Sequence, residues 1–131
     1  MSNILLKLIK FGIGFILFIP LYVGGSFFFP FIFPKIWLFQ LVTEIILFLY
    51  VILAVSDGRF RPKFNSVMTA VLLLTAVLVI TSLTGIDAFR SFWGNTERMS
   101  GVIAWLHFMA FAVILSAVLK TEKEWRNFFG I

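Results

Sequence analysis

Four long apolar runs divide the chain, and short segments that carry most of the charged residues separate them. Each run has about the 20 residues that a helix needs to cross a bilayer. We expect spans at about residues 11–29, 36–55, 67–84 and 102–119. The pattern therefore predicts an all-α fold, a polytopic bundle of transmembrane helices.

Helix-breaking and capping residues refine these spans. Pro20 lies inside the first run, where its missing N–H predicts a kink in the middle of the helix. Asn65 or Ser66 can cap the start of the third span, and Thr96 or Ser100 can cap the fourth. Each cap would satisfy a backbone donor at a helix start.

The tail after the fourth run predicts one more helix. Thr121 and Glu124 have the spacing of a capping box, and Trp125, Phe128 and Phe129 then share one helical face. This helix either lies on the membrane surface or starts a fifth span, and we favour the second interpretation. Residues 1–131 are then a single transmembrane domain, the N-terminal fragment of a larger membrane protein.

Composition supports a membrane protein. Hydrophobic residues make up 61% of the 131 residues and charged residues only 13%, which excludes a soluble domain of this size. The net charge of +5 comes from basic residues between the apolar runs, a pattern of membrane anchoring and not of nucleic-acid binding. With no cysteine, one histidine and no phosphate-binding glycine loop, the chain is expected to hold no metal and no cofactor.

The distribution of basic residues predicts the orientation. Four spans put both termini on one side, together with eight basic residues: Lys7, Lys10, Arg59, Arg61, Lys63, Lys120, Lys123 and Arg126. The other side has three: Lys35, Arg90 and Arg98. Because cytoplasmic segments carry the excess of lysine and arginine, we expect cytoplasmic termini. Residues 85–101 then face the periplasm or the exterior.

Two ionisable residues lie inside predicted spans. A glutamate within the membrane is a candidate site residue. At 1.5 Å per residue, Glu44 lies about 12 Å and His107 about 9 Å below the outer surface. A polar layer at this depth suits a lipid-linked headgroup or a proton path. The two residues can equally satisfy each other, or backbone and water, as a packing device. Because the helix rotations are unknown, a direct contact is the less favoured outcome.

The connector at residues 89–101 is unusually polar for a loop between spans. Arg90 and Arg98 flank Gly94, and guanidinium groups grip phosphate with two hydrogen bonds. We take Arg90, Arg98, Trp93 and Asn95 as candidate residues for binding a diphosphate or a glycan. In the structural alternative, Arg98 pairs with a neighbouring carboxylate, Arg90 reaches lipid headgroups and Trp93 anchors the interface.

Residues 91–101, Ser-Phe-Trp-Gly-Asn-Thr-Glu-Arg-Met-Ser-Gly, precede a span that contains His107, and Lys-Thr-Glu-Lys-Glu-Trp follows at residues 120–125. This arrangement resembles the N-terminal region of bacterial O-antigen ligase-like proteins. Residues 29–35 and 61–65 resemble the same group. The similarity covers most of the chain, and its most specific part is the Trp-Gly-Asn-x-Glu-Arg core.

The resemblance implies a polytopic enzyme of the bacterial inner membrane with a large periplasmic loop. Such enzymes transfer a glycan from undecaprenyl diphosphate to an acceptor such as lipid A core, without nucleotide or metal. It implies as partners the bilayer, the lipid-linked glycan, the acceptor and the remaining helices of the full-length protein. Arginines bind the diphosphate, and a histidine of the large loop is the suspected base. His107 lies in a span and does not match that base, so this chain alone is expected to be catalytically incomplete.

Two other functions stay open. The chain could be a complete four-span transporter or a glycolipid flippase-like protein that uses Glu44 as its proton or substrate site. It could also be a structural membrane subunit without chemistry.

Overall fold

The computed structural model describes residues 2–23, 32–95 and 100–130. Within these ranges the chain forms helices and no strand, which confirms the all-α prediction. The elements are α1 (Ser2–Phe18), the 3-10 turn η1 (Ile19–Leu21), α2 (Phe33–Ser56), the 3-10 turn η2 (Gly58–Phe60), α3 (Ser66–Thr84), α4 (Ala88–Trp93), α5 (Val102–Val118) and α6 (Glu122–Phe129).

Several helices are long and apolar enough to cross a membrane. Among the described residues, α1 with η1, α2 and α3 each qualify by length and composition. Helices α5 and α6 qualify as a pair, with a bend of 115° between them. Because α5 has 17 residues, it lies at the short end of the range for a span. The fold therefore has three such helices, or four with the bent pair.

The first helix differs from its predicted boundaries. It begins at Ser2, nine residues before the expected start, and so includes Lys7 and Lys10, whose long side chains can reach the membrane surface. The expected kink at Pro20 is wrong, because Pro20 lies in η1, where the helix ends. Proline lacks the N–H that the next helical turn requires. The later part of the predicted range, from residue 24, lies outside the described residues.

The predicted caps of the other spans agree only in part with the structure. The side chain of Asn65 accepts a hydrogen bond from the backbone N–H of Met68 at 2.8 Å, which confirms the predicted cap of α3. The Ser100 cap of α5 is wrong, because Gly101 holds that position and no side chain caps it. The alternative cap, Thr96, lies outside the described residues.

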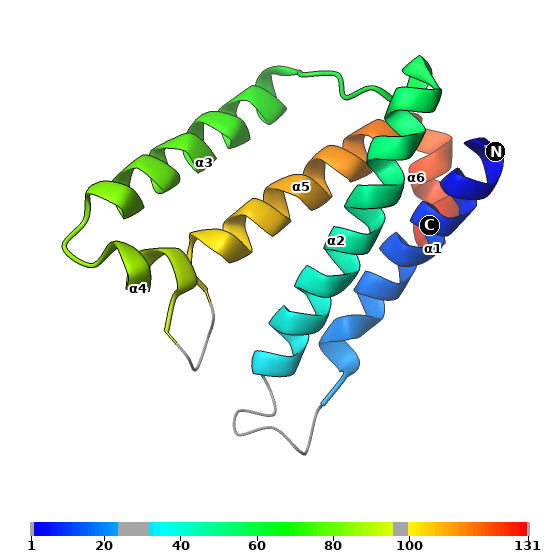
Figure 1. The fold of residues 1–131 in the computed structure, drawn as a ribbon. Helices are drawn as coiled ribbons and strands as arrows, with labels where there is room; N and C mark the ends of the chain where they lie inside the picture. Colours follow the sequence, from blue (N-terminus) through cyan, green and yellow to red (C-terminus); the bar gives the residue numbers. More distant parts are fainter. Residues whose placement is uncertain (1, 24–31, 96–99, 131) are drawn as a thin grey trace.

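The main core lies where α1, α2 and α5 meet. Buried Ile9, Ile13 and Ile16 of α1 follow helical spacing and pack with the buried side chains of α2 and α5. A Cβ atom at Gly12 would lie 2.4 Å from the Ile46 side chain, so glycine is what lets α1 approach α2 so closely. Helix α3 contacts α5 from the other side and leaves most of its own surface uncovered (Figure 1).

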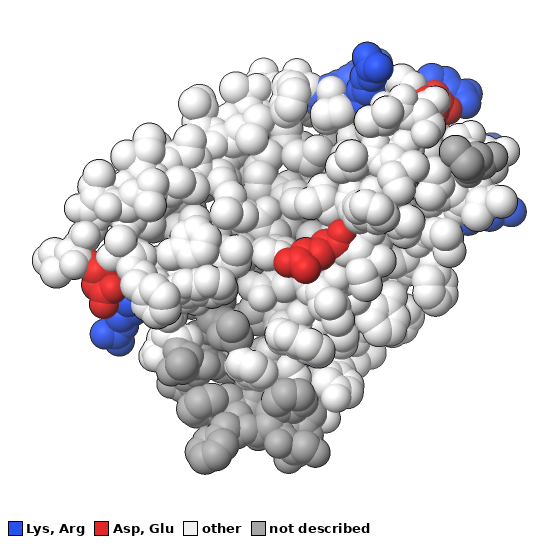
Figure 2. Space-filling view, in the orientation of Figure 1, with Lys and Arg blue, Asp and Glu red and all other residues white. Residues whose placement is uncertain are grey.

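One end of the bundle gathers the basic segments. The predicted capping box of Thr121 and Glu124 is confirmed, and Glu124 also lies 3.6 Å from the Lys10 ammonium. Lys120 donates to the carbonyl of Arg59, and the Trp125 indole N–H donates to the carbonyl of Leu119 at 2.9 Å. These contacts join the middle of α1, the η2 turn and the α5–α6 corner. Figure 2 shows lysine and arginine gathered at this end.

The turn between α2 and α3 is organised by one aspartate. Asp57 accepts hydrogen bonds from the side chain and the backbone N–H of Arg59, and these bonds lower the pKa of Asp57. The Tyr50 hydroxyl donates to the carbonyl of Phe60 at 3.0 Å. The basic turn is therefore folded onto the end of α2.

The basic end provides a test of orientation. Because the chain has no cysteine, single-cysteine variants report position without background. We expect a membrane-impermeant maleimide to label Ile86→Cys in intact spheroplasts, and Lys63→Cys only after permeabilisation. Both native side chains are exposed. The reverse labelling pattern would contradict the predicted orientation.

Candidate functional site

The two ionisable residues of the predicted spans are in contact. The Nε2 atom of His107 on α5 lies 3.1 Å from Oε1 of Glu44 on α2. The Nδ1 atom of His107 lies 2.7 Å from the carbonyl oxygen of Ile103, one turn earlier on α5. The side chain of His107 is only 12% exposed, whereas that of Glu44 is 65% exposed. The sequence placed these residues at similar depth, but the expectation that they do not touch is wrong, because the packing of α2 on α5 turns them toward each other.

Both ring nitrogens of His107 have a polar partner. A carbonyl oxygen only accepts, so the contact with Ile103 is a hydrogen bond that Nδ1 of His107 donates. Nε2 of the same ring lies within hydrogen-bonding distance of the Glu44 carboxylate. A carboxylate with such a partner is less costly inside a membrane than a lone one.

Other polar side chains of the predicted layer are used for packing. Thr43 is fully buried, and neither its hydroxyl nor the Nε2 atom of Gln40 has a hydrogen-bond partner in the described structure. Thr81 donates to the carbonyl of Val77, within its own helix. Figure 2 shows acidic atoms in the middle of a face that is otherwise uncharged between its ends. Glu44 is thus the exposed ionisable group of the layer.

A short helix that the sequence analysis missed forms the connector after α3. Asp87 caps α4, because its carboxylate accepts a hydrogen bond from the backbone N–H of Arg90 at 2.9 Å. An aspartate three residues before Arg90 is the sequence signal for this cap. Arg90 is exposed, and no described carboxylate lies within 4.0 Å of its guanidinium. Arg90 is thus an exposed cation of the connector.

Two glycines close the loop that follows α4. Gly94 has φ +80° and ψ −172°, a conformation that is essentially restricted to glycine. A Cβ atom at Gly94 would lie 2.5 Å from the backbone nitrogen of Gly101, and one at Gly101 would lie 2.2 Å from the carbonyl oxygen of Phe92. The backbones therefore touch where the loop leaves α4 and where it enters α5. The two ends of this loop, at Gly94 and Gly101, are therefore in contact.

The candidate binding residues are only partly described. Trp93 is 46% exposed and packs beside the rings of Phe89 and Phe92, and Asn95 is exposed. Arg98 lies outside the described residues. Arg90, Trp93 and Asn95 thus share the connector, near the glycine contact.

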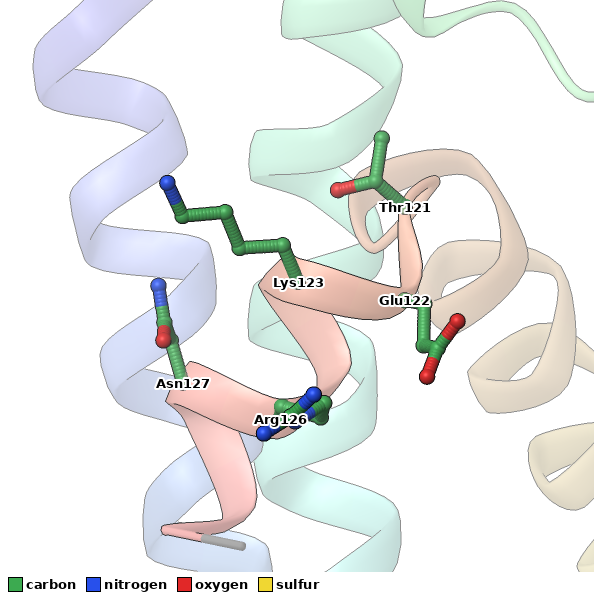
Figure 3. Close-up of a pocket in the computed structure, with 5 residues that line it drawn as sticks. All are labelled: Thr121, Glu122, Lys123, Arg126 and Asn127. Atoms are coloured by element: carbon green, nitrogen blue, oxygen red, sulfur yellow. The ribbon is translucent and has the colours of Figure 1, made fainter.

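A second polar region lies along α6. Its pocket of about 630 Å³ is lined by Thr121, Glu122, Lys123, Arg126 and Asn127. Figure 3 shows Lys123 and Asn127 on one side of the helix and Glu122 on the other. These side chains do not converge on one point, so this region offers surface charge and no defined site.

No family model, curated protein or solved structure matches this chain. Within the part of the chain that the structure describes, no group of three or more histidine, cysteine, aspartate or glutamate residues could hold a metal ion. The closed connector and the intramembrane pair are therefore the two candidate sites of the described chain.

The glycine contact predicts that Gly94→Ala destabilises the connector. The strained backbone alone costs about 1–3 kcal/mol, and the new Cβ atom would also collide with Gly101. We expect a lower thermal midpoint in detergent and faster protease cleavage between residues 94 and 101. Gly130→Ala is the matched control, because Gly130 also has a positive φ but no atom within 4 Å of the new Cβ. Equal effects of the two variants would contradict the proposed backbone contact.

Proposed function

We propose that residues 1–131 are the N-terminal membrane part of an O-antigen ligase-like protein. This protein transfers a glycan from a polyprenyl-diphosphate carrier to an acceptor on the outer face of the bacterial inner membrane. The sequence resemblance is the source of the proposal. The described helices are compatible with it, since they include three or four potential spans.

The observation that carries the proposal is the glycine contact between Gly94, in the most specific part of the resemblance, and Gly101. A connector that only joins two spans needs no glycine-restricted backbone and no contact between its ends. Glycine adopts this conformation without strain, and it is also the residue that allows a backbone to approach a ligand closely. The contact holds together the two ends of the segment that contains Asn95 and Arg98.

The proposed chemistry of the connector is substrate binding. The guanidinium groups of Arg90 and Arg98 bind the diphosphate, where they offset charge on the leaving group. Trp93 offers an exposed ring on which a sugar can stack, and Asn95 offers an amide for hydrogen bonding. The base that activates the acceptor comes from another part of the full-length protein.

The arginines provide the test of this proposal. In the protein encoded by the complete reading frame, we expect Arg90→Ala and Arg98→Ala each to lower glycan transfer about tenfold or more, because each removes charged hydrogen bonds to the diphosphate. Transfer is measured from a polyprenyl-diphosphate-linked glycan to lipid acceptor in membranes.

Arg61→Ala is the matched control, because Arg61 is an exposed arginine on the predicted cytoplasmic side. It should leave transfer unchanged. Full transfer by both connector variants at normal protein levels would reject the proposal, as would a stop codon directly after Ile131.

A second candidate function is proton-coupled transport through the intramembrane pair. The observation that favours it is the contact of His107 with Glu44, whose carboxylate is partly exposed. Proton relays in transporters use residues of this kind. Under this hypothesis the chain is a small transporter or a glycolipid flippase-like protein.

Glu44→Gln tests the transport hypothesis. The amide keeps the shape of the side chain but cannot take up and release the proton, so we expect proton-coupled transport to stop. Proteoliposomes with a pH-sensitive dye measure proton movement when candidate substrates are added. Thr84→Ala, which removes a hydroxyl at the end of α3, should transport normally. Unchanged proton movement in Glu44→Gln would exclude this mechanism.

A further inference from the structure

Helix α2 carries two parallel stripes of residues with heptad spacing. One is buried against α1 and α5 and consists of Phe39, Thr43, Ile46, Tyr50 and Leu53. The other is exposed and consists of Trp37, Leu41, Glu44, Phe48, Val51 and Val55. We call this second set the Glu44 stripe. Alternating steps of four and three residues place each set along one side of the helix, as in helices that pack side by side.

The Glu44 stripe is not covered by any described helix. Phe48 is 69% exposed and Val55 is 75% exposed. Helix α3 packs on α5 and stands apart from α2, so α2 and α3 flank α5 (Figure 1). The stripe runs nearly the full length of α2, which is enough for a second helix to lie beside it.

Glu44 distinguishes this stripe from a surface that simply faces lipid. It is the twelfth of the 24 residues of α2 (44 − 33 + 1), and so lies in the middle of the span. One carboxylate oxygen contacts His107, and the described residues supply no hydrogen-bond donor to the other. Lipid chains offer no donor at this depth, so an exposed acceptor there is costly.

We propose that the Glu44 stripe is the docking surface for a further transmembrane helix, outside the six described here, that donates a hydrogen bond to Glu44 from an uncharged amide or hydroxyl side chain. The donor is uncharged because a lysine or arginine side chain is costly in the middle of a membrane. A single polar residue within an apolar stripe also fixes the register of the two helices.

The depth of the available donors argues against a second copy of this chain as the partner. Thr75, in the middle of α3, donates its hydroxyl to a carbonyl of its own helix. Thr69 and Ser82 lie near the ends of α3, away from the depth of Glu44, and the Nε2 atom of Gln40 is buried. The inference goes beyond the proposed glycan transfer, because it names the chemistry of a helix partner and uses no residue of the connector.

The test uses two synthetic transmembrane peptides of leucine and alanine, one with a single central asparagine and the other with leucine at that position. The chain is labelled at Val67→Cys, an exposed site at the start of α3, and peptide binding in phosphatidylcholine vesicles is measured by energy transfer. We expect the asparagine peptide to bind about tenfold more tightly, as hydrogen bonds between helices in model peptides do.

Variants of Glu44 test whether this residue causes the tighter binding of the asparagine peptide. Glu44→Leu should remove it, and Glu44→Gln should keep it, because the amide oxygen still accepts. Glu44→Leu/His107→Leu should also show no preference, and it avoids leaving His107 unpaired. Ile45→Ala is the matched control, because Ile45 is exposed but lines a groove between α1 and α2 with Leu8 and Phe11.

Three results would overturn the inference. Equal binding of the two peptides would remove the need for a donor, and a preference that survives Glu44→Leu would place the contact elsewhere. Energy transfer between two labelled copies of the chain that is lost in Phe48→Ala would make a second copy the partner. None of these results depends on glycan transfer, so they leave the proposed function untouched.

Discussion

The position of α2 between α1 and α5 is the constraint on which the rest of the structure depends. Gly12 allows α1 to approach the Ile46 side chain of α2, and Phe39 stacks on Phe108 of α5 at 4.7 Å. Inside a membrane, helices gain little from the hydrophobic effect when they associate, so close packing and polar contacts hold them together. Helix α2 has both kinds of contact, since Glu44 reaches His107 on α5. Helices α3 and α4 join the fold through α5.

Different kinds of interaction stabilise the two ends of the bundle. At the basic end, the capping box of α6, the contact of Lys10 with Glu124 and the bond from Lys120 to the η2 turn connect separate helices through charged groups. At the other end, the connector after α3 relies on backbone geometry, because the contact of Gly94 with Gly101 leaves no room for a side chain. Charged contacts tolerate change at a surface, whereas a backbone contact does not. The connector is therefore the end of the bundle that is more sensitive to substitution.

The sequence predicted well wherever one residue determines a local outcome. The capping box at Thr121 and the cap at Asn65 depend only on residues three positions away, and both are present. The predicted kink at Pro20 failed because proline can either bend a helix or end one, and the choice depends on whether later residues continue the helix. The cap at Ser100 failed because Gly101 packs against α4, a contact that comes from outside the helix it begins. Helix α4 was missed because six residues give too weak a periodic pattern.

The sequence by itself determined the class of the protein, the approximate spans and the similar depth of Glu44 and His107, because apolar length and a fixed rise per residue decide these properties. Only the tertiary structure decided that the two side chains meet, because contact requires the rotation of both helices about their axes, which depends on packing along their whole length. The same packing decided which stripe of α2 is buried and which is left exposed. The contact that closes the connector was also decided by the tertiary structure. Gly94 and Gly101 are seven residues apart and touch only when the chain turns back on itself.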